Sequence, residues 1–370
     1  MSHFFTGRAV AAATAVAAFL YLTSNIFAQQ DPGAVYTMSN AAGGNVVLIF
    51  NRAADGALSN AGIVSTGGAG QGSELGSQGA LVLSQDHRWL LAANAGSNDV
   101  TVFSVTDDGL QFRSKTPSGG TAPVSIAIRD HLVYVLNAGT TNVTGFRLRP
   151  DGTLTSIAGA TQTLNGAAGP AQVSFDDGGD LLVVTDKPTN QIFTLRVDDD
   201  GVAGALVSHS SNGATPFGFS FDKRNHVVIS EAHGGPNNSS ALSSYDVDEN
   251  GDLRLVTGSA PTHQNAACWV VITRNGKFAF TSDTASSVIT GFQVARDGGL
   301  TILNADGRSA TLPAGSAPTD LALSENSRFL FSLNPGAGTI AGWRISVDGS
   351  LAFTGAVTGI PPSATGIATR

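Results

Sequence analysis

Short apolar segments that end on an acidic or amide residue recur along the whole chain. Examples are "VYTMSN" near the N-terminus, "LLVVTD", "VVISE" and "FAFTSD" in the middle, and "FLFSLN" near the C-terminus. The residues that close the seven segments are Asn40, Asn94, Asn137, Asp186, Glu231, Asp283 and Asn334. They lie roughly 50 residues apart, a period that is typical of one four-stranded blade of a β-propeller. The pattern therefore predicts seven blades.

The residues around each marker supply the other strands of a blade. A large apolar residue follows in the next strand of each repeat, namely Phe50, Phe103, Phe146, Leu195, Tyr245, Phe292 and Trp343. Turns such as "PDGTL" and "VDGSL" come next, and their glycine supplies the positive φ that hairpin turns require. A further short apolar strand, as in "PAQVSF", precedes the marker in the later repeats. We therefore predict an all-β fold with four strands in each blade.

The two ends of the chain complement each other. The first repeat lacks the leading strand, whereas the C-terminus carries a spare one in "PPSATGIAT", which begins at Pro361. If this C-terminal strand pairs into the first blade, it closes the ring and removes two exposed sheet edges. We predict that residues 34–370 form a single seven-bladed β-propeller domain.

The residues before the propeller have the pattern of a secretory signal. Arg8 is followed by an apolar run from Ala9 to Leu22 and, later, by the small residue Ala28. This arrangement predicts a signal peptide over residues 1–28 and a short linker over 29–33. An uncleaved N-terminal anchor is the alternative. After cleavage we expect no membrane span and an exported protein, either periplasmic or extracellular.

Composition excludes several classes of function. A formal net charge of -8 argues against nucleic-acid binding, which needs a basic surface. The single cysteine, Cys268, cannot form an internal disulfide, and it is either a small buried hydrophobe or a catalytic thiol. The chain has no G-x-S-x-G elbow, no phosphate-binding glycine loop and no recognised metal-ligand spacing. We expect a monomer that needs neither a cofactor nor a metal.

Two long segments, "GALVLSQDHRWLLAANAGSNDVTVFSVTDDGL" and "ENSRFLFSLNPGAGTIAGWRISVDGSL", resemble the lactonase-type seven-bladed propellers. That family includes bacterial 6-phosphogluconolactonases and fungal carboxymuconate-lactonizing enzymes. The resemblance implies catalytic side chains at the starts of the fourth, fifth and sixth blades, where this chain has Ala171, Phe217 and Trp269. Of the positions that the resemblance makes functional, Glu231 is the one that matches. The resemblance therefore implies a propeller of lactonase lineage in which most of the expected catalytic groups are replaced.

Glu231 and His233 are the candidate catalytic residues. They are two positions apart at the end of a strand, and in an extended segment such residues point to the same side. A carboxylate beside an imidazole can hold one tautomer of the ring, which then transfers protons near neutral pH. The alternative is that Glu231 closes its turn through hydrogen bonds, as its counterparts in the other blades do.

In a β-propeller, the second strand of each blade ends on the same face of the ring on which the first strand of each blade begins. The candidate ligand-binding residues of that face are Gln172, Asp186, Lys187, His263, Gln264 and Asp283. A hollow at the channel mouth is a common kind of ligand site. Arginines such as Arg129 and Arg274 fall in the turns of the opposite face. We therefore expect a small neutral ligand or a glycan, and we do not expect a phosphorylated sugar lactone.

Two functions are consistent with the sequence. The first is that of an exported lactonase-like enzyme that hydrolyses or forms a non-phosphorylated lactone ring. The second is that of a non-catalytic propeller that binds a partner protein, a glycan or a surface polymer through its channel-mouth face. The family resemblance favours the first function, whereas the replaced catalytic positions favour the second.

Overall fold

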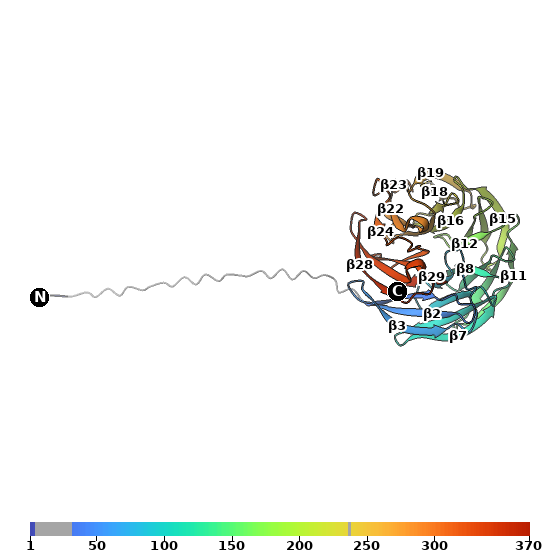
Figure 1. Ribbon diagram of the computed structural model, residues 1–370, viewed down its shortest axis with the longest axis horizontal. Helices are drawn as coiled ribbons and strands as arrows, with labels where there is room; N and C mark the ends of the chain where they lie inside the picture. Colours follow the sequence, from blue (N-terminus) through green and yellow to red (C-terminus); the bar gives the residue numbers. More distant parts are fainter. Residues whose placement is uncertain (4–31, 236–237) are drawn as a thin grey trace. The chain divides into compact units, whose positions relative to one another are not determined.

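A computed structural model describes residues 1–3, 32–235 and 238–370. Within these residues the chain forms seven antiparallel sheets around a ring, which is a seven-bladed β-propeller (Figure 1). The predicted fold class is therefore confirmed. The predicted signal peptide (1–28) and most of the predicted linker (29–33) lie outside the described residues. No helix in the described part of the chain is both long enough and apolar enough to cross a membrane.

The first four blades follow one another along the chain. The first contains β1 (Gly33–Met38), β2 (Val46–Arg52) and β3 (Leu58–Ser65). The second contains β4 (Leu81–Leu83), β5 (Trp89–Asn94), β6 (Asp99–Thr106) and β7 (Gly109–Pro117). The third contains β8 (Pro123–Arg129), β9 (Leu132–Asn137), β10 (Asn142–Leu148) and β11 (Leu154–Thr163). The fourth contains β12 (Pro170–Phe175), β13 (Leu181–Asp186), β14 (Gln191–Val197) and β15 (Ala203–Ser210).

The remaining blades continue in the same order. The fifth contains β16 (Pro216–Phe221), β17 (His226–Glu231), β18 (Ala241–Val247) and β19 (Leu253–Pro261). The sixth contains β20 (Ala267–Ile272), β21 (Phe278–Asp283), the 3-10 turn η1 (Thr284–Ser286), β22 (Val288–Val294), β23 (Leu300–Ile302) and β24 (Ala310–Thr311). The seventh contains β25 (Asp320–Leu323), β26 (Phe329–Asn334), η2 (Pro335–Ala337), β27 (Thr339–Ile345) and β28 (Leu351–Thr358), and β29 (Thr365–Thr369) ends the chain.

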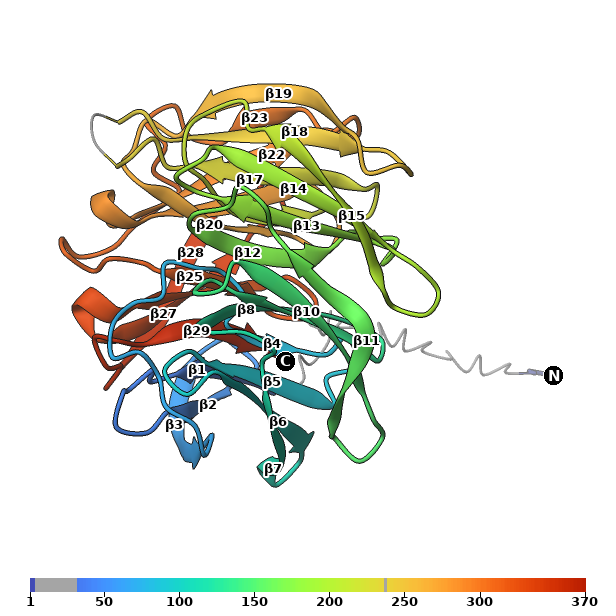
Figure 2. The same cartoon turned by 90° about the vertical axis from the view of Figure 1, so that its right-hand side faces the viewer.

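In the second to seventh blades the first strand lies nearest the ring centre and the last lies outermost. In Figure 1, β8, β12 and β16 lie closer to the centre than β11, β15 and β19, and Figure 2 shows the outer strands β11 and β15 nearest the viewer. The sixth blade departs from the regular pattern because its outer position is divided. There β23 pairs with the end of β22 and β24 pairs with its start.

The C-terminal strand closes the ring as predicted. β29 pairs antiparallel with β1 and becomes the innermost strand of the first blade. Thr37 Oγ1 donates a hydrogen bond to the carbonyl oxygen of Gly366 at 2.7 Å, which ties the two strands together from the side. Figure 2 shows β29 next to β1, which separates it from β2. β29 therefore covers the inner edge of β1.

The blades pack against each other through large apolar side chains. The seven residues predicted for this role are all buried, with no more than 4% exposed: Phe50, Phe103, Phe146, Leu195, Tyr245, Phe292 and Trp343. The clusters that they join draw on neighbouring blades, and Phe50 packs with Phe331 of the seventh blade. Burial of each such side chain stabilises the fold by about 1.5–3 kcal/mol.

Turn glycines allow the outer hairpins to sit on the preceding blade. Gly349 has a φ of 86°, and a Cβ at this position would lie 2.7 Å from the ring of Phe278 in the sixth blade. Gly56 has a φ of 93°, and its Cβ would lie 2.4 Å from the ring of Phe329. A larger residue would therefore be strained in its backbone and would also clash with the neighbouring blade.

Candidate functional site

The seven marker residues occupy equivalent positions, because each lies at or just after the end of the second strand of its blade. All are fully buried: Asn40, Asn94, Asn137, Asp186, Glu231, Asp283 and Asn334. In the second blade, Asn94 Nδ2 donates to Asp99 Oδ1 at 2.7 Å and to Thr101 Oγ1 at 2.9 Å in the next strand. Such bonds join the second strand to the third and fix the turn between them.

Glu231 makes three hydrogen bonds inside the fifth blade. Its Oε1 accepts from the backbone N–H of Gly213 at 2.8 Å and from Ser243 Oγ at 2.5 Å. Its Oε2 accepts from Ser259 Oγ at 2.6 Å. These donors come from the loop before β16, from β18 and from β19, so the carboxylate joins three segments of one blade.

His233 lies close to Glu231 but not in the extended geometry that its spacing suggests. β17 ends at Glu231, and His233 has a φ of 49° in the following turn. Its Nε2 is 3.7 Å from Glu231 Oε2, and the side chain is 28% exposed. Neither residue lines the two cavities of the central channel described below. The proton-transfer role assigned to this pair stays a prediction.

Asp186 and Asp283 also bond within their own blades. Asp186 Oδ1 accepts from the N–H groups of Gly169 at 2.7 Å and Ala168 at 3.1 Å. Asp283 Oδ2 accepts from Thr290 Oγ1 at 2.7 Å. Burial raises the pKa of Asp283 to about 7, and the hydrogen bond from Thr290 opposes that shift only in part. At neutral pH this carboxyl is therefore partly protonated.

A segment of the β3–β4 loop closes the channel on the face of the marker residues. Lys187 Nζ donates to the carbonyl oxygen of Gly76 and lies 4.7 Å from the centroid of the Phe217 ring. Trp269 Nε1 donates to the carbonyl oxygen of Ser77 at 2.8 Å. Burial lowers the pKa of Lys187, and the nearby Glu74 carboxylate raises it in part. Residues 74–79, which we call the plug, therefore cover the place where a ligand was expected to bind.

The side chains beneath the plug are apolar. Ala171, Phe217, Ala232, Cys268 and Trp269 form one buried cluster, in which the rings of Phe217 and Trp269 lie 4.9 Å apart. Three of these residues occupy positions where the family resemblance implies catalytic groups. Cys268 is buried in this cluster, and burial raises the pKa of its thiol to about 12, which disfavours the thiolate at neutral pH.

The remaining predicted residues separate into two groups. Gln264 is buried, and its Nε2 donates to the carbonyl oxygen of Asp306 at 2.7 Å, while His263 is exposed on the same loop. Gln172, in contrast, lies on β12 and lines the central channel. Its side-chain amide pairs with the backbone of Phe219 on β16, donating at 3.0 Å and accepting at 2.7 Å. Of the predicted ligand-binding residues, Gln172 is thus the one that borders the channel cavities.

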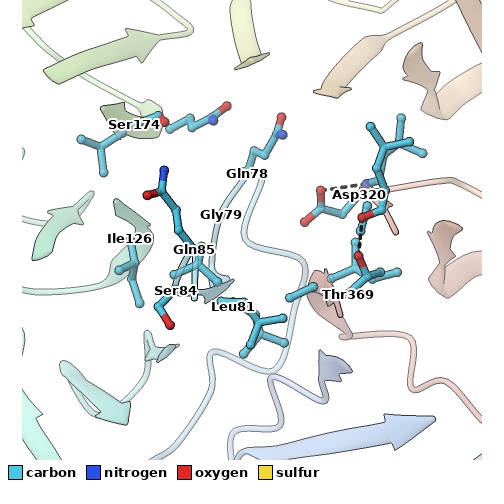
Figure 3. A pocket seen from close by; sticks show the side chains of 18 of the residues that line it. Gln78, Gly79, Leu81, Ser84, Gln85, Ile126, Ser174, Asp320 and Thr369 are labelled. Carbon is cyan, nitrogen blue, oxygen red and sulfur yellow. Dashed lines mark hydrogen bonds between the residues drawn. The ribbon is translucent and has the colours of Figure 1, made fainter. Parts of the chain in front are cut away.

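The central channel contains two adjoining cavities of about 360 Å³ and about 330 Å³. Both are bordered by Gln78, Gln85, Gln172 and Ser174, and the larger one is also bordered by Asp320. Figure 3 shows Gln85 and Asp320 on different sides of the hollow, with Gln78 between them. Amide, hydroxyl and carboxyl groups therefore border a space that is also lined by apolar side chains such as Leu81 and Ile126.

These cavities lie on the opposite side of the plug from the predicted face. Gln78 of the plug borders both cavities. Farther from the plug, the lining residues include His87 in the turn after β4, Asp177 after β12 and Thr369 at the end of β29. The channel is therefore hollow toward the turns between first and second strands. The sequence could not indicate this, because the β3–β4 loop gives no local sign that it crosses the channel.

Asp320 is the carboxyl group that lines the larger cavity. It is 3% exposed, and its Oδ1 accepts from the backbone N–H of Leu321 at 2.8 Å. Burial raises its pKa well above the usual value, although hydrogen bonds from the N–H groups of Leu321 and Ile367 act in the opposite direction. Asp320 is the first residue of β25, the inner strand of the seventh blade.

Comparison with known proteins identifies the lineage of the chain. The family model described as "Lactonase, 7-bladed beta-propeller" matches residues 27–163 and 234–365. The unmatched stretch between them contains Ala171, Phe217, Glu231 and His233. No curated protein matches the chain.

Solved structures share the fold over nearly the whole chain. The periplasmic gluconolactonase PpgL of Pseudomonas aeruginosa has a TM-score of 0.71 at 16% identity and covers 90% of this chain and 99% of its own. A protein of Lactobacillus plantarum has a TM-score of 0.73 at 16% identity, with coverage of 92% and 99%. A Bacteroides uniformis protein, proposed to be a 6-phosphogluconolactonase, has a TM-score of 0.70 at 18% identity, with coverage of 91% and 99%. At these identities the likeness shows a common fold.

Proposed function

Because the chain belongs to the lactonase family of seven-bladed β-propellers, we propose that it is an exported protein that binds and hydrolyses a non-phosphorylated lactone in its central channel. The observation that carries this proposal is the pair of channel cavities bordered by Gln78, Gln85, Gln172 and Asp320. The plug and the apolar cluster fill the opposite end of the channel. A ligand therefore reaches the glutamines and Asp320 from the other face of the ring, where turns join the first strand of each blade to the second.

The polar groups of the channel suit a neutral, hydroxyl-rich ligand. Gln172 and Gln78 pair with the backbone of Phe219 and Val270. Each of these amides keeps a second N–H and a second oxygen lone pair, which can bond to the hydroxyl groups of a polyol or a sugar ring. Among the described residues that border the two cavities, Arg129 is the one arginine or lysine, and Asp176 and Asp177 border the same cavity. The cavity therefore lacks the excess of positive charge that a phosphate group requires.

Asp320 is the proposed general base for ring opening. In its ionised form it accepts a proton from a water molecule, and the oxygen of that water attacks the lactone carbonyl carbon. The bond between the carbonyl carbon and the ring oxygen then breaks, the ring oxygen takes up a proton, and the product is a hydroxy acid. A raised pKa makes an aspartate a stronger base near neutral pH. We expect the rate to increase with pH as Asp320 loses its proton.

Export is part of the proposal. The signal-peptide pattern of residues 1–28 supports it, and so does the periplasmic location of the Pseudomonas aeruginosa gluconolactonase, which has the same fold. Mass spectrometry of protein recovered from the cell envelope or the medium should show a new N-terminus near Gln29.

A non-catalytic propeller is the second candidate, and one observation favours it. Ala171, Phe217 and Trp269 occupy positions where the family resemblance implies catalytic groups, and they belong to one apolar cluster. In that case the channel binds a lactone, a glycan or another polyol without turnover.

Steady-state hydrolysis of D-gluconolactone, corrected for spontaneous hydrolysis, tests the proposal. We expect Asp320→Asn to lower kcat by about 100-fold or more, the usual loss when a general base is removed. The matched control is Asp283→Asn, which alters a buried carboxyl outside the channel and should retain activity. Equal activity of Asp320→Asn and the wild type would contradict the assignment. Binding of D-gluconolactam by a wild type that does not turn over the lactone would favour the non-catalytic function.

A further inference from the structure

A third cavity lies outside the channel, between the second and third blades. Its volume is about 390 Å³, and it is bordered by Arg88, Trp89, Ser104, Arg113, Pro150 and Asp151. Most of these residues belong to the second blade, while Pro150 and Asp151 come from the turn between β10 and β11 of the third. None of them borders the two channel cavities.

The structure holds the cationic side of this cavity in place. Arg113 Nε donates to Ser104 Oγ at 2.9 Å, and its Nη2 donates to Gln111 Oε1 at 2.9 Å. Arg113 takes part in none of the ion pairs of the described residues. Its guanidinium group therefore keeps N–H donors for an outside partner in an orientation that two hydrogen bonds fix.

The aromatic side of the cavity is partly exposed. Trp89 is half-buried, whereas Trp269 and Trp343 are at most 4% exposed. The guanidinium carbon of Arg88 lies 6.0 Å from the centroid of the Trp89 ring. An indole ring and two guanidinium groups therefore occupy one hollow of a protein whose net charge is -8.

The turn of the third blade completes the cavity. Ser114 Oγ donates to the carbonyl oxygen of Gly152 at 2.7 Å and holds this turn against the second blade. Asp151 Oδ1 accepts from the N–H and from Oγ1 of Thr153, at 3.0 Å and 2.7 Å. These bonds lower the pKa of Asp151, so its carboxylate is ionised at neutral pH and can accept hydrogen bonds from ligand hydroxyls.

We propose that this cavity binds a sugar acid, a pyranose ring that carries a carboxylate. Arg113 and Arg88 pair with the carboxylate, because a guanidinium group matches its two oxygens. Trp89 contacts the C–H face of the ring, since an indole combines a large apolar surface with fixed geometry. Asp151 accepts from the hydroxyl groups. The site is separate from the channel and does not depend on the function proposed there.

Titration with D-galacturonate, followed by tryptophan fluorescence and by saturation-transfer NMR, tests this inference. We expect saturable binding by the wild type, and binding of the neutral sugar D-galactose about tenfold weaker or more, because it lacks the charge-assisted hydrogen bonds. Arg113→Gln should weaken galacturonate binding about tenfold. The control Arg149→Gln removes an exposed cation of the same turn that does not border the cavity, and it should bind like the wild type.

The following results would overturn the inference. They are the absence of saturable galacturonate binding, equal binding of galactose, unchanged binding in Arg113→Gln, and an equal loss in Arg149→Gln. Arg88→Gln provides a second variant on an exposed side chain, and thermal unfolding of each variant checks that it is folded. Displacement of galacturonate by D-gluconolactam would also contradict a site that is separate from the channel.

Discussion

Glu231 and Asp283 occupy equivalent positions in neighbouring blades, but different numbers of donors reach their carboxyl groups. Glu231 accepts from Gly213, Ser243 and Ser259, whereas Asp283 accepts from Thr290 and has a pKa raised to about 7 by burial. The sequence predicted that both positions carry polar groups at strand ends. It could not show how many donors surround each one, because those donors come from loops and strands elsewhere in the blade.

The raised pKa of Asp283 predicts a pH-dependent stability. Below pH about 4 both the folded and the unfolded state are protonated, and the contribution of this group to stability is fully present. As the pH rises to about 7, the carboxyl group of Asp283 ionises in the unfolded state before it ionises in the folded state. The free energy of unfolding therefore falls by about 2–4 kcal/mol. Asp283→Asn keeps the shape and cannot ionise, so urea unfolding should show a flatter profile over this range. Identical profiles for the variant and the wild type would contradict the assignment.

At the scale of elements, the plug decides which side of the channel is open. Gln78 Nε2 donates to the carbonyl oxygen of Val270 at 2.8 Å, and Gln78 Oε1 accepts from its N–H at 3.0 Å. This side chain thus replaces a strand partner for β20. The strands and their turns could be predicted from apolar periodicity and glycine positions, whereas the course of this loop depends on partners almost two hundred residues away in the chain.

Gln78→Ala should destabilise the protein. It leaves the N–H and the carbonyl group of Val270 without the amide that pairs with them, and the expected loss is about 1–3 kcal/mol in the free energy of unfolding. Gln85→Ala is the matched control, because Gln85 is an exposed glutamine of the same channel, and it should change stability by no more than about 0.5 kcal/mol. Urea unfolding measures both. Equal stability of the two variants would show that the plug is not held by Gln78.

At the scale of the whole molecule, the ring depends on its last strand. The sequence indicated this closure because the first repeat lacked a strand and the C-terminus had one to spare, and the pairing of β29 with β1 confirms it. The position of the candidate site was less predictable. The repeat places all seven markers on one face, but it does not show that their side chains are buried.

Deletion of residues 360–370 should therefore be severe. It removes the inner strand of the first blade and exposes the edge of β1 to the channel. We expect insoluble protein, or a broad unfolding transition without cooperativity in calorimetry. A truncated protein that melts like the full chain would contradict the role of β29 as the closing strand.

The most direct test of the channel as the ligand site is calorimetric titration of D-gluconolactam into three proteins: the wild type, Gln85→Ala and Glu231→Gln. Gln85 borders both channel cavities, whereas Glu231 is bonded within the fifth blade and borders neither. We expect Gln85→Ala to weaken binding by about tenfold, as for a lost hydrogen bond to a ligand, and Glu231→Gln to bind like the wild type with reduced stability. Loss of binding in Glu231→Gln at unchanged stability, together with normal binding in Gln85→Ala, would contradict this account and return the site to the face of the marker residues.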